Sequence, residues 1–412
     1  MKAFDDAYSA ILAEVRARRA ENFNVDTSNG PVVRAARLPG LKDVEVKPKI
    51  AYFCWHFPVP SETFVLNELR LLVANNVDVI VFCRQTPHKN FKPDFPITFE
   101  RVSSPEQLAA RLKETGRTIV HAHFAYPTVT DMVWPACEAV QIPFTFIAHA
   151  QDIFKYDNDR LNRLAEIGAS PLCRAMFTLS NYHLEFVVAR GFPRSKVIIN
   201  PNAVDTEKFS VRDFSSATRQ ARRVIAVHRF VPKKGLDLLI RSAQYLVDLD
   251  ILIEIYGYGE LEEQYKAIIA ELGLTNVHMR GPLTQDQVAN VMSTADLFAC
   301  PCVQVPHTGD MDGLPTSLIE GMAAGVPVLT TDVGAVPELV EDGITGIVAE
   351  PTAESVAAAI RRFYGMPESQ VRAMVRCAAD HVMRTHDAGR LVRVLMRVWQ
   401  NKTIDILIVS WN

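Results

Sequence analysis

Short apolar segments, each about the length of one strand, alternate with amphipathic helical segments along most of this 412-residue chain. They fall into two series, divided by the polar turn Asn202-Ala203-Val204-Asp205. Such alternation predicts βαβ units, in which parallel strands form a sheet and helices cover its faces. The expected strands are Ile50–Cys54, Val77–Cys83, Thr118–Ala122, Phe144–Ala148, Ala175–Leu179 and Lys196–Ile199, then Arg223–Val227, Ile251–Tyr256, Val277–Arg280, Leu297–Ala299, Val326–Thr330 and Gly346–Val348. We therefore expect an α/β protein of two Rossmann-like, doubly wound domains.

Composition agrees with two domains. A chain of this length with 48% hydrophobic residues can bury two separate cores, and one large domain is the less favoured alternative. A net charge of −3 gives no basic surface for nucleic acid, so no nucleic-acid partner is expected. The arginines near the N-terminus, such as Arg16 and Arg34, are better explained as a solvated helix face than as an anion-binding surface.

No apolar run approaches the roughly 20 residues of a membrane span, and the N-terminus lacks the apolar core of a signal peptide, so we expect a cytoplasmic protein. Seven scattered cysteines suit reduced structural thiols. Cys300-Pro301-Cys302 is the only close pair, and no second pair of ligands lies at the spacing of a zinc site. No metal site is predicted.

The segment from Asp312 to Leu329 carries the strongest functional signal. It places a carboxylate in a loop, Pro315 at the expected first position of a helix, a second carboxylate at Glu320 and then a buried strand. The amides of Gly313 and Leu314 are left as donors at a helix N-terminus, which attracts phosphate or hydroxyl-rich anionic ligands. The pattern predicts a sugar-nucleotide site.

A second candidate segment, Ala226 to Leu236, follows a strand and leads into an expected helix over Leu236–Leu246. Arg229 and Lys234 are predicted to bind a diphosphate, because arginine offers a forked donor and lysine a point charge, while Lys233 is expected to face solvent. Taken alone, a Lys-Lys-Gly turn is more commonly a solvated helix start.

Three further turns are weaker candidates. Gly257 and Gly259 end a strand where the backbone can approach a ligand, and Arg280 ends the next strand; both are equally consistent with ordinary strand-to-helix turns. His149 is expected at the carboxyl edge of the first sheet, although a lone histidine is more often structural. His121 and His123 have no carboxylate or cysteine at ligand spacing, so they are expected to line the site at most.

Together, these motifs resemble those of the retaining glycosyltransferases of family 4, whose acidic-x7-acidic motif is matched by Asp312 and Glu320, with Asp312 where most members have glutamate. The resemblance covers most of residues 50 to 400 and implies the GT-B fold, with a cleft between the two domains. It implies that Asp312 contacts the donor hexose, that the Gly313 and Leu314 amides face the sugar and phosphate, and that Glu320 holds the ribose. It also implies that His149 lies near the reaction centre, with Gly257, Gly259 and Arg280 beside the nucleotide.

The segment Ser61-Glu62-Thr63-Phe64 is similar to one found in members that make exopolysaccharides, which puts Ser61, Glu62 and Thr63 at the mouth of the cleft. The alternative, compatible with the first, is a helix cap at Ser61.

The expected organisation is an N-terminal helix and linker over 1–48, an acceptor domain over 49–204, a nucleotide-sugar domain over 205–385, a closing helix over 386–400 and a terminal strand over 401–412. The helical segment Ala388–Val398 resembles the helix that returns to the first domain in this family. The terminal strand resembles the opening strand of a family 2 glycosyltransferase, which would make the chain part of a bifunctional protein; an ordinary terminal strand is the alternative.

The resemblance implies transfer of a hexosyl group, with retention of configuration, from a UDP- or GDP-sugar to a glycan or lipid-linked oligosaccharide. No other cofactor is expected, and a lipid-linked acceptor implies peripheral contact with the inner face of the cell membrane. Two alternatives remain open: a sugar-nucleotide epimerase of the same fold, and a non-catalytic nucleotide-binding partner of a fused transferase. A phosphorylase would need a lysine for pyridoxal phosphate, for which the sequence offers no convincing candidate.

Overall fold

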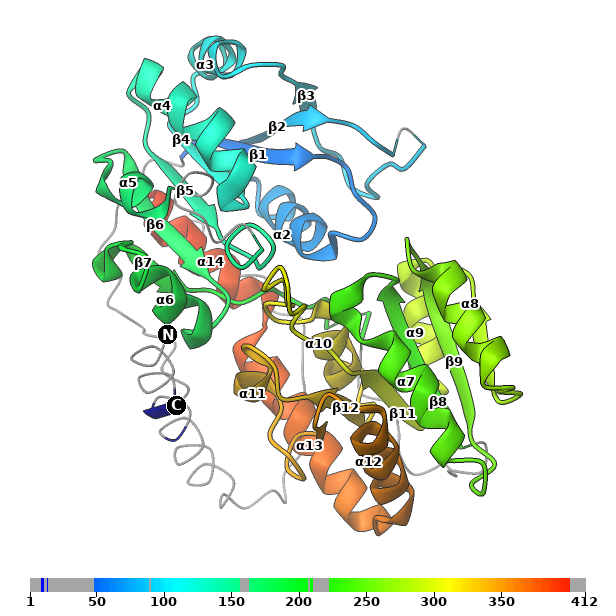
Figure 1. The fold of residues 1–412 in the computed structure, drawn as a ribbon. Helices are drawn as coiled ribbons and strands as arrows, with labels where there is room; N and C mark the ends of the chain where they lie inside the picture. The colour runs from blue at the N-terminus through cyan, green and yellow to red at the C-terminus, as the bar shows by residue number, and fades with distance from the viewer. Residues whose placement is uncertain are drawn as a thin grey trace. The chain divides into compact units, whose positions relative to one another are not determined.

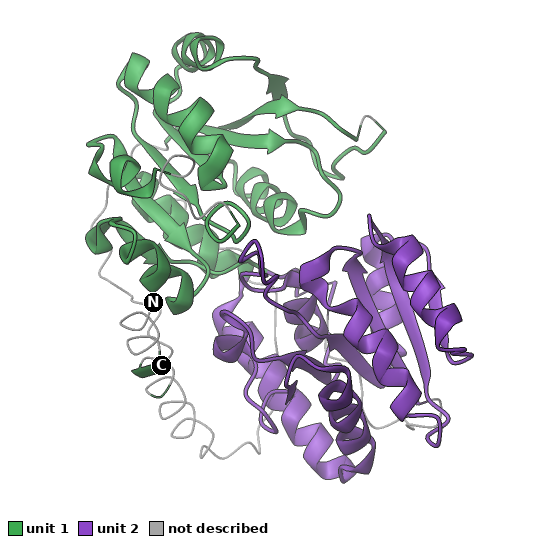
Figure 2. Cartoon of the chain, viewed as in Figure 1, with its two compact units in different colours: residues 1–203, 388–412 green, residues 204–387 purple. Residues whose placement is uncertain are grey.

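The computed structural model describes residues 48–400 apart from 89, 156–162, 207 and 210–221, together with residues 9, 10 and 13. The rest of the predicted N-terminal helix and linker, and all of the predicted terminal strand over 401–412, lie outside the described residues. The chain forms two compact units, shown in Figure 2: unit 1 comprises residues 1–203 and 388–412, and unit 2 comprises residues 204–387.

Unit 1 contains a seven-stranded parallel sheet with the strand order β3-β2-β1-β4-β5-β6-β7. Its strands are β1 (Ile50–His56), β2 (Val79–Gln85), β3 (Phe99–Arg101), β4 (Ile119–His123), β5 (Phe144–Ile147), β6 (Cys173–Thr178) and β7 (Val197–Ile199). Figure 1 shows this sheet between helical layers. Each predicted strand is present, with ends that differ by one or two residues. The short edge strand β3 was not predicted, because Phe99 is exposed and Glu100 and Arg101 break any apolar run.

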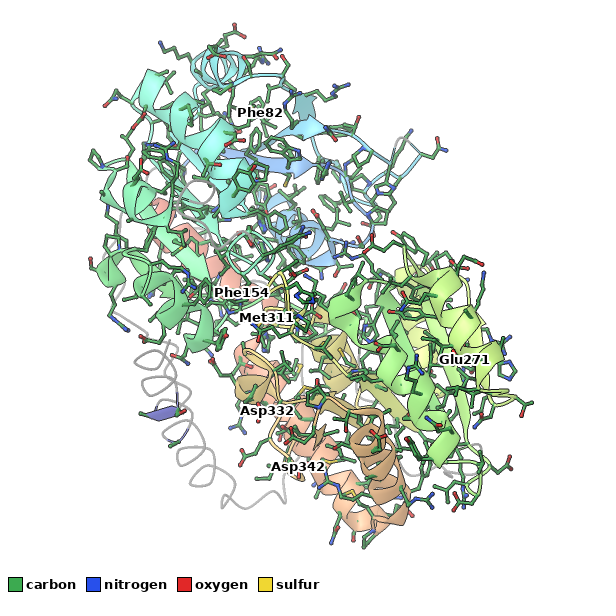
Figure 3. The ribbon with its side chains drawn as sticks, viewed as in Figure 1. Phe82, Phe154, Glu271, Met311, Asp332 and Asp342 are labelled. Carbon is green, nitrogen blue, oxygen red and sulfur yellow. The ribbon has the colours of Figure 1, made fainter. Side chains whose placement is uncertain are left out.

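The helical segments of unit 1 are α2 (Thr63–Ala74), α3 (Pro105–Glu114), η1 (Ala125–Val133), α4 (Trp134–Val140), α5 (Leu164–Ala169), α6 (Asn181–Val188), the turn η2 (Arg194–Lys196) and α14 (Ala388–Trp399). Helix α14 packs against α2, and the Trp399 indole donates a hydrogen bond of 3.0 Å to Thr145 on β5. The predicted cap at Ser61 is wrong: Glu62 precedes the first helical residue, Thr63, and makes no side-chain cap. Phe82 on β2, labelled in Figure 3, is fully buried in this unit's core.

Unit 2 contains a six-stranded parallel sheet with the strand order β10-β9-β8-β11-β12-β13. Its strands are β8 (Arg223–Arg229), β9 (Leu252–Tyr258), β10 (Val277–Arg280), β11 (Leu297–Cys300), β12 (Val328–Thr331) and β13 (Ile347–Ala349). Two parallel sheets of this order confirm the predicted pair of Rossmann-like α/β domains.

The helical segments of unit 2 are η3 (Pro232–Lys234), α7 (Leu236–Ser242), η4 (Ala243–Tyr245), α8 (Glu262–Glu271), α9 (Gln285–Ser293), α10 (Thr316–Ala323), α11 (Val336–Leu339), α12 (Ala353–Gly365) and α13 (Glu368–Thr385). One core, which includes Leu239 of α7 and Ile360 of α12, covers one face of the sheet. Helix α10 lies against the sheet through Gly321, whose ideal Cβ would be 3.3 Å from the Phe298 ring. The sheet is therefore buried on both faces, as parallel sheets usually are.

Candidate functional site

The turn after β8 brings two lysines to the carboxyl edge of the sheet in unit 2. Gly235 has a left-handed backbone (φ 56°), and an added Cβ would lie 2.0 Å from the Pro301 carbonyl oxygen, so only glycine fits there. The Val303 amide donates to the Lys233 carbonyl at 2.9 Å, which ties this turn to the loop after β11. The lysines of the β8–α7 turn are thereby held against the loop that carries Asp310 and Asp312.

Lys234 and Asp312 form a buried ion pair. Lys234 Nζ donates to Asp312 Oδ2 at 2.5 Å, and the two side chains are 12% and 11% exposed. The Cys302 thiol donates to the same oxygen at 3.3 Å. The sequence-predicted cation and acid of the donor site therefore lie in direct contact.

The sequence predicts that Lys233 faces solvent, but in the structure it does not. Its side chain is 7% exposed, and its Nζ lies 3.1 Å from Asp310 Oδ1 and 3.9 Å from Asp312 Oδ1. The prediction is wrong because the turn buries the side chain beside the two aspartates, which compensate its charge. Arg229, by contrast, ends β8 with an exposed side chain, and no carboxylate among the residues with described positions forms an ion pair with it.

The electrostatics of the pair follow from its burial and its charges. Burial acts to lower the pKa of Lys234, but the Asp312 carboxylate outweighs this effect and holds the pKa above its usual value. Burial acts to raise the pKa of Asp312, and the charges of Lys234 and Lys233 outweigh it, so this pKa lies below its usual range. Both groups are charged at neutral pH.

Helix α10 begins one residue later than predicted, because Pro315 precedes the first helical residue, Thr316. Within the described part of the chain, the Gly313 and Leu314 amides donate to no protein acceptor. Met311, labelled in Figure 3, is buried just before this loop. Glu320 lies in the second turn of α10 and is buried. The loop and helix thus bring together the acid, the amide donors and the second acid of the predicted motif.

The two glycines at the end of β9 have a packing role in the structure. Gly257 has a φ of 143°, and an added Cβ would lie 1.8 Å from the His228 carbonyl oxygen; at Gly259 the corresponding distance to the Phe230 oxygen is 2.5 Å. These glycines let the end of β9 approach the end of β8. Their predicted place beside a nucleotide stays a prediction.

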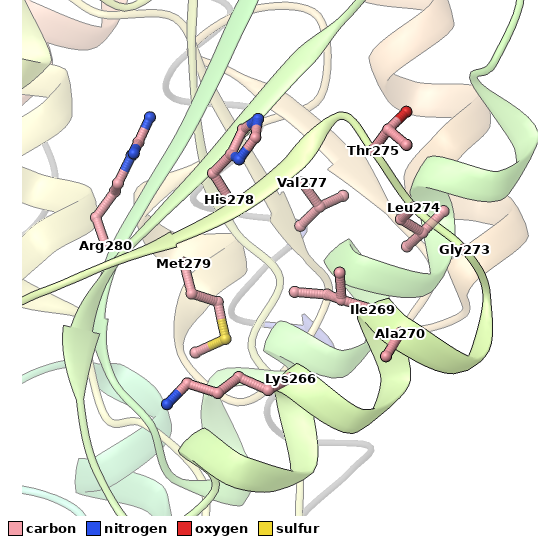
Figure 4. Close-up of a pocket in the computed structure, with 10 residues that line it drawn as sticks. All are labelled: Lys266, Ile269, Ala270, Gly273, Leu274, Thr275, Val277, His278, Met279 and Arg280. Atoms are coloured by element: carbon pink, nitrogen blue, oxygen red, sulfur yellow. The ribbon is translucent and has the colours of Figure 1, made fainter.

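Arg280 is engaged within the sheet. Its guanidinium donates to Glu254 Oε1 at 3.0 and 2.9 Å, and Glu254 also binds Arg223. Arg280 borders an open pocket of about 570 Å³ formed by α8 and β10, which includes Lys266 and His278 (Figure 4). That pocket includes neither Lys234 nor Asp312, so we do not assign it to the donor site.

His149 follows β5 in unit 1 and is buried among aromatic rings. Its Nε2 lies 2.8 Å from His123 Nδ1, and its ring centroid is 4.5 Å from that of Phe64. Burial and then the neighbouring imidazoles lower the pKa of His149 well below its usual value, so it is neutral at physiological pH. Asp152 accepts from the amides of His149, Ala150 and Ala125, which fixes the loop after β5.

Sequence reasoning missed several contacts in both units. Cys302 contacts Asp312 and Asp310 contacts Lys233, and no local pattern pointed to either contact. In unit 1, Glu68 of α2 lies 3.5 Å from His121 Nε2 and 3.7 Å from His123 Nε2. The expectation that no carboxylate accompanies these histidines is therefore wrong, because a helix far from β4 in sequence supplies one.

Two units, each with a parallel Rossmann-like sheet, are the architecture of proteins with the GT-B fold. Two family models match consecutive parts of the chain: "Glycosyltransferase Family 4" over residues 61–208 and "Glycosyl transferases group 1" over residues 210–376. The chain belongs to this family of glycosyltransferases, as the resemblance of its motifs predicted.

Individual relatives agree with the family. The chain is 26% identical over 376 residues to the amylovoran biosynthesis glycosyltransferase AmsK of Erwinia amylovora, covering 76% of this chain and 90% of that protein. It is 26% identical over 408 residues to the putative colanic acid biosynthesis glycosyltransferase WcaL of Escherichia coli, covering 84% and 97%. Among solved structures, Anabaena HepE in complex with UDP and glucose is similar with a TM-score of 0.69 at 17% identity, covering 86% of this chain and 100% of HepE. That structural likeness supports the GT-B fold.

The described part of the chain contains no helix with the length and apolar character needed to cross a membrane.

Proposed function

We propose that this glycosyltransferase moves a hexosyl group from a nucleotide diphosphate sugar, a UDP- or GDP-sugar, to a hydroxyl acceptor with retention of configuration. The observation that carries the proposal is the Lys234–Asp312 pair, whose acid lies in the loop that leads into the helix bearing Glu320. A charge pair beside amide donors at a helix N-terminus is suited to a ligand with both a diphosphate and sugar hydroxyls.

Each residue has a proposed role. Lys234 and Arg229 stabilise the charge that develops on the departing diphosphate, together with the amides of Gly313 and Leu314. Asp312 binds hydroxyls of the donor hexose and holds Lys234 in place until the diphosphate arrives, which its 2.5 Å contact with Lys234 supports. Glu320 binds the ribose.

The remaining donor-site proposals rest on the family resemblance. Gly257, Gly259 and Arg280 flank the nucleotide, and His149 contacts the donor sugar. The Ser61-Glu62-Thr63 segment lies on the acceptor side.

We propose a glycan or lipid-linked oligosaccharide of cell-surface polysaccharide synthesis as the acceptor. Support comes from AmsK and WcaL, whose names place them in amylovoran and colanic acid biosynthesis and which align over most of this chain. Such an acceptor implies that a cytoplasmic enzyme works in peripheral contact with the inner face of the cell membrane.

The experiment first identifies the nucleotide. A thermal-shift screen with UDP, GDP and ADP, followed by their sugars, reveals the preferred donor, because a ligand that binds only the native state raises its stability. Transfer from that donor to a lipid-linked acceptor is then measured, and the anomeric configuration of the product is read by NMR. An inverted product would refute the retaining mechanism.

Lys234→Met tests the assigned cation. We expect kcat to fall by about 10²- to 10³-fold, the usual cost of one donor that stabilises a developing charge. Lys266→Met is the matched control, because Lys266 is a half-exposed lysine on α8 of the same unit. A Lys234→Met enzyme that stays folded and keeps wild-type turnover would remove Lys234 from the mechanism.

The two alternatives give different results in the same assays. An epimerase would convert the sugar nucleotide when no acceptor is present. A non-catalytic partner would bind the nucleotide but would turn over none of the acceptors.

A further inference from the structure

Four polar side chains meet in the interior of unit 1. His121 and His123 are two residues apart on β4 and therefore point to the same face of the sheet. Tyr52 lies opposite His121 on the neighbouring strand β1, and Glu68 comes from α2. The rings and the carboxylate are all buried.

The distances between their ligand atoms are close to those of a metal-ligand set. One ligand atom each from Glu68, His121 and His123 lie within 4.8 Å of one another. Glu68 Oε1 is 3.5 Å from His121 Nε2 and 3.7 Å from His123 Nε2. Tetrahedral zinc with bonds of about 2.0–2.2 Å holds its ligand atoms roughly 3.3–3.5 Å apart, so small side-chain shifts complete the geometry.

The polar groups of this cluster are incompletely satisfied within the described residues. His121 Nε2 is fully buried and has no hydrogen-bond partner, although it points toward Glu68. Among the described residues, Glu68 has no lysine or arginine within ion-pair distance, and its side chain is only 11% exposed. A buried carboxylate without a compensating cation is costly, and a bound cation would remove that cost.

Each imidazole contacts a polar side chain through its Nδ1 atom. His121 Nδ1 lies 2.8 Å from Thr145 Oγ1, and His123 Nδ1 lies 2.8 Å from His149 Nε2. Histidine ligands of metals commonly bind a polar group through the other ring nitrogen, which fixes the tautomer and directs the free nitrogen to the metal. Here His121 Nε2 lies 3.5 Å from the Glu68 carboxylate, and His123 Nε2 lies 3.7 Å from it and contacts the Tyr52 hydroxyl.

Tyr52 supplies a fourth candidate ligand atom, its hydroxyl oxygen, at the same point. Its hydroxyl donates to Glu68 Oε1 at 2.9 Å and also contacts His123 Nε2. A small cavity of about 10 Å³ adjoins Glu68 and His123 and is bordered by Phe64 and Asn202. That volume is roughly enough for one water molecule, so the cavity beside the cluster can hold a small ligand but not a sugar.

We propose that Glu68, His121 and His123 bind one divalent transition-metal ion, with the Tyr52 oxygen completing the set, and that Zn²⁺ is the ion that fits these ligands. Two imidazoles with a carboxylate are a known zinc ligand type. The ion would join α2 to β4 and, through His123, would orient the imidazole of His149. This inference does not rest on the proposed function.

The test uses the whole 412-residue chain without a tag. The protein is dialysed against a chelator, returned to metal-free buffer and titrated with Zn²⁺ by calorimetry and with Co²⁺ by visible absorption. We expect about one ion bound per chain and the intense spectrum of four-coordinate Co²⁺. Zn²⁺ should also raise the melting temperature, since the ligand atoms come together only in the native state.

Variants separate the site from general metal binding. Glu68→Gln keeps an oxygen that accepts from Tyr52 but removes the anionic ligand, so the affinity should fall by at least about 100-fold. Thr145→Val removes the hydroxyl beside His121 Nδ1, which also accepts from the Trp399 indole, and the affinity should fall by about 10- to 100-fold. His278→Gln, at an exposed histidine on β10, should bind as the wild type does.

Three results would overturn the proposal. One is a stripped wild-type protein that shows no saturable uptake of Zn²⁺ or Co²⁺, which would leave the cluster as a hydrogen-bond network. Another is a Co²⁺ spectrum of the weak six-coordinate type. The third is unchanged affinity in both Glu68→Gln and Thr145→Val. If Glu68→Gln does not fold, the Co²⁺ spectrum of the wild type and the Zn²⁺ affinity of Thr145→Val still test the proposal.

Discussion

Removing one partner of the Lys234–Asp312 pair should destabilise unit 2, and the two single variants should differ in a defined order. At 2.5 Å, with an effective dielectric constant of about 20, the attraction is about 6–7 kcal/mol before the cost of desolvation. Breaking a buried pair usually costs about 3–5 kcal/mol, because one charge is left without compensation.

The groups that remain beside the unpaired charge decide which variant loses more free energy of unfolding. In Lys234→Met, Asp312 keeps Lys233 at 3.9 Å and the Cys302 thiol at 3.3 Å, so we expect the lower end, about 3 kcal/mol. In Asp312→Asn, Lys234 has no other carboxylate within ion-pair distance among the described residues, so we expect the upper end, about 5 kcal/mol. The double variant should cost less than the sum by about 1–3 kcal/mol.

The assay must report on unit 2. The tryptophans that the structure describes, Trp55, Trp134 and Trp399, lie in unit 1, so tryptophan fluorescence follows the other unit and serves as the control. Native-state hydrogen exchange of peptides from β8 and α10, read by mass spectrometry, gives the opening free energy of unit 2. Its changes should appear in these peptides while the fluorescence transition stays in place.

The pH range of the effect follows from the two pKa shifts. A lowered pKa of Asp312 contributes stability above the unfolded value near 3.9 that is lost as the pH falls below it. A raised pKa of Lys234 contributes stability below the unfolded value near 10.4 that is lost at higher pH. The coupling energy should thus be constant between about pH 5 and 9. Additive single variants at pH 7, or a larger cost for Lys234→Met than for Asp312→Asn, would refute this account.

Two further predictions concern stability. Burial lowers the pKa of His183 to about 4, so the folded state resists protonation of this histidine. Unit 1 should therefore lose up to about 3 kcal/mol of its free energy of unfolding as the pH falls from about 6.5 to 4. Urea unfolding followed by tryptophan fluorescence checks this; a His183→Gln variant with an undiminished pH slope would contradict it. Gly257→Ala should destabilise unit 2 by more than about 2 kcal/mol, because its Cβ would clash with the His228 oxygen. The control is Gly273→Ala, whose Cβ would meet nothing within 4 Å and which should cost about 1 kcal/mol. Equal melting temperatures for the two variants would contradict the packing role of Gly257.

Local sequence patterns predicted the elements of this fold well. Buried parallel strands are continuous apolar runs, and most of them are followed by a helical segment, so both series could be recognised without tertiary information. Prediction failed where no apolar pattern exists, as at β3, and at a helix start, where Pro315 precedes α10 instead of opening it. Helix ends depend on one or two backbone angles, which a residue type biases but does not determine.

The candidate sites show a different limit, because their chemistry lies in pairings between distant segments. Asp312 was predicted as a sugar ligand and Lys234 as a phosphate ligand, each from its own loop, yet the two are 78 residues apart and bind each other. Glu68 was not considered at all, since a glutamate on an amphipathic helix is ordinary until β4 places two histidines beside it. Parallel strands explain both cases: their crossover connections separate in sequence the residues that one sheet edge or face brings together. A residue type and its local turn therefore indicate which chemical group lies at a position. Which charged side chain that group contacts is decided by the register of the sheet.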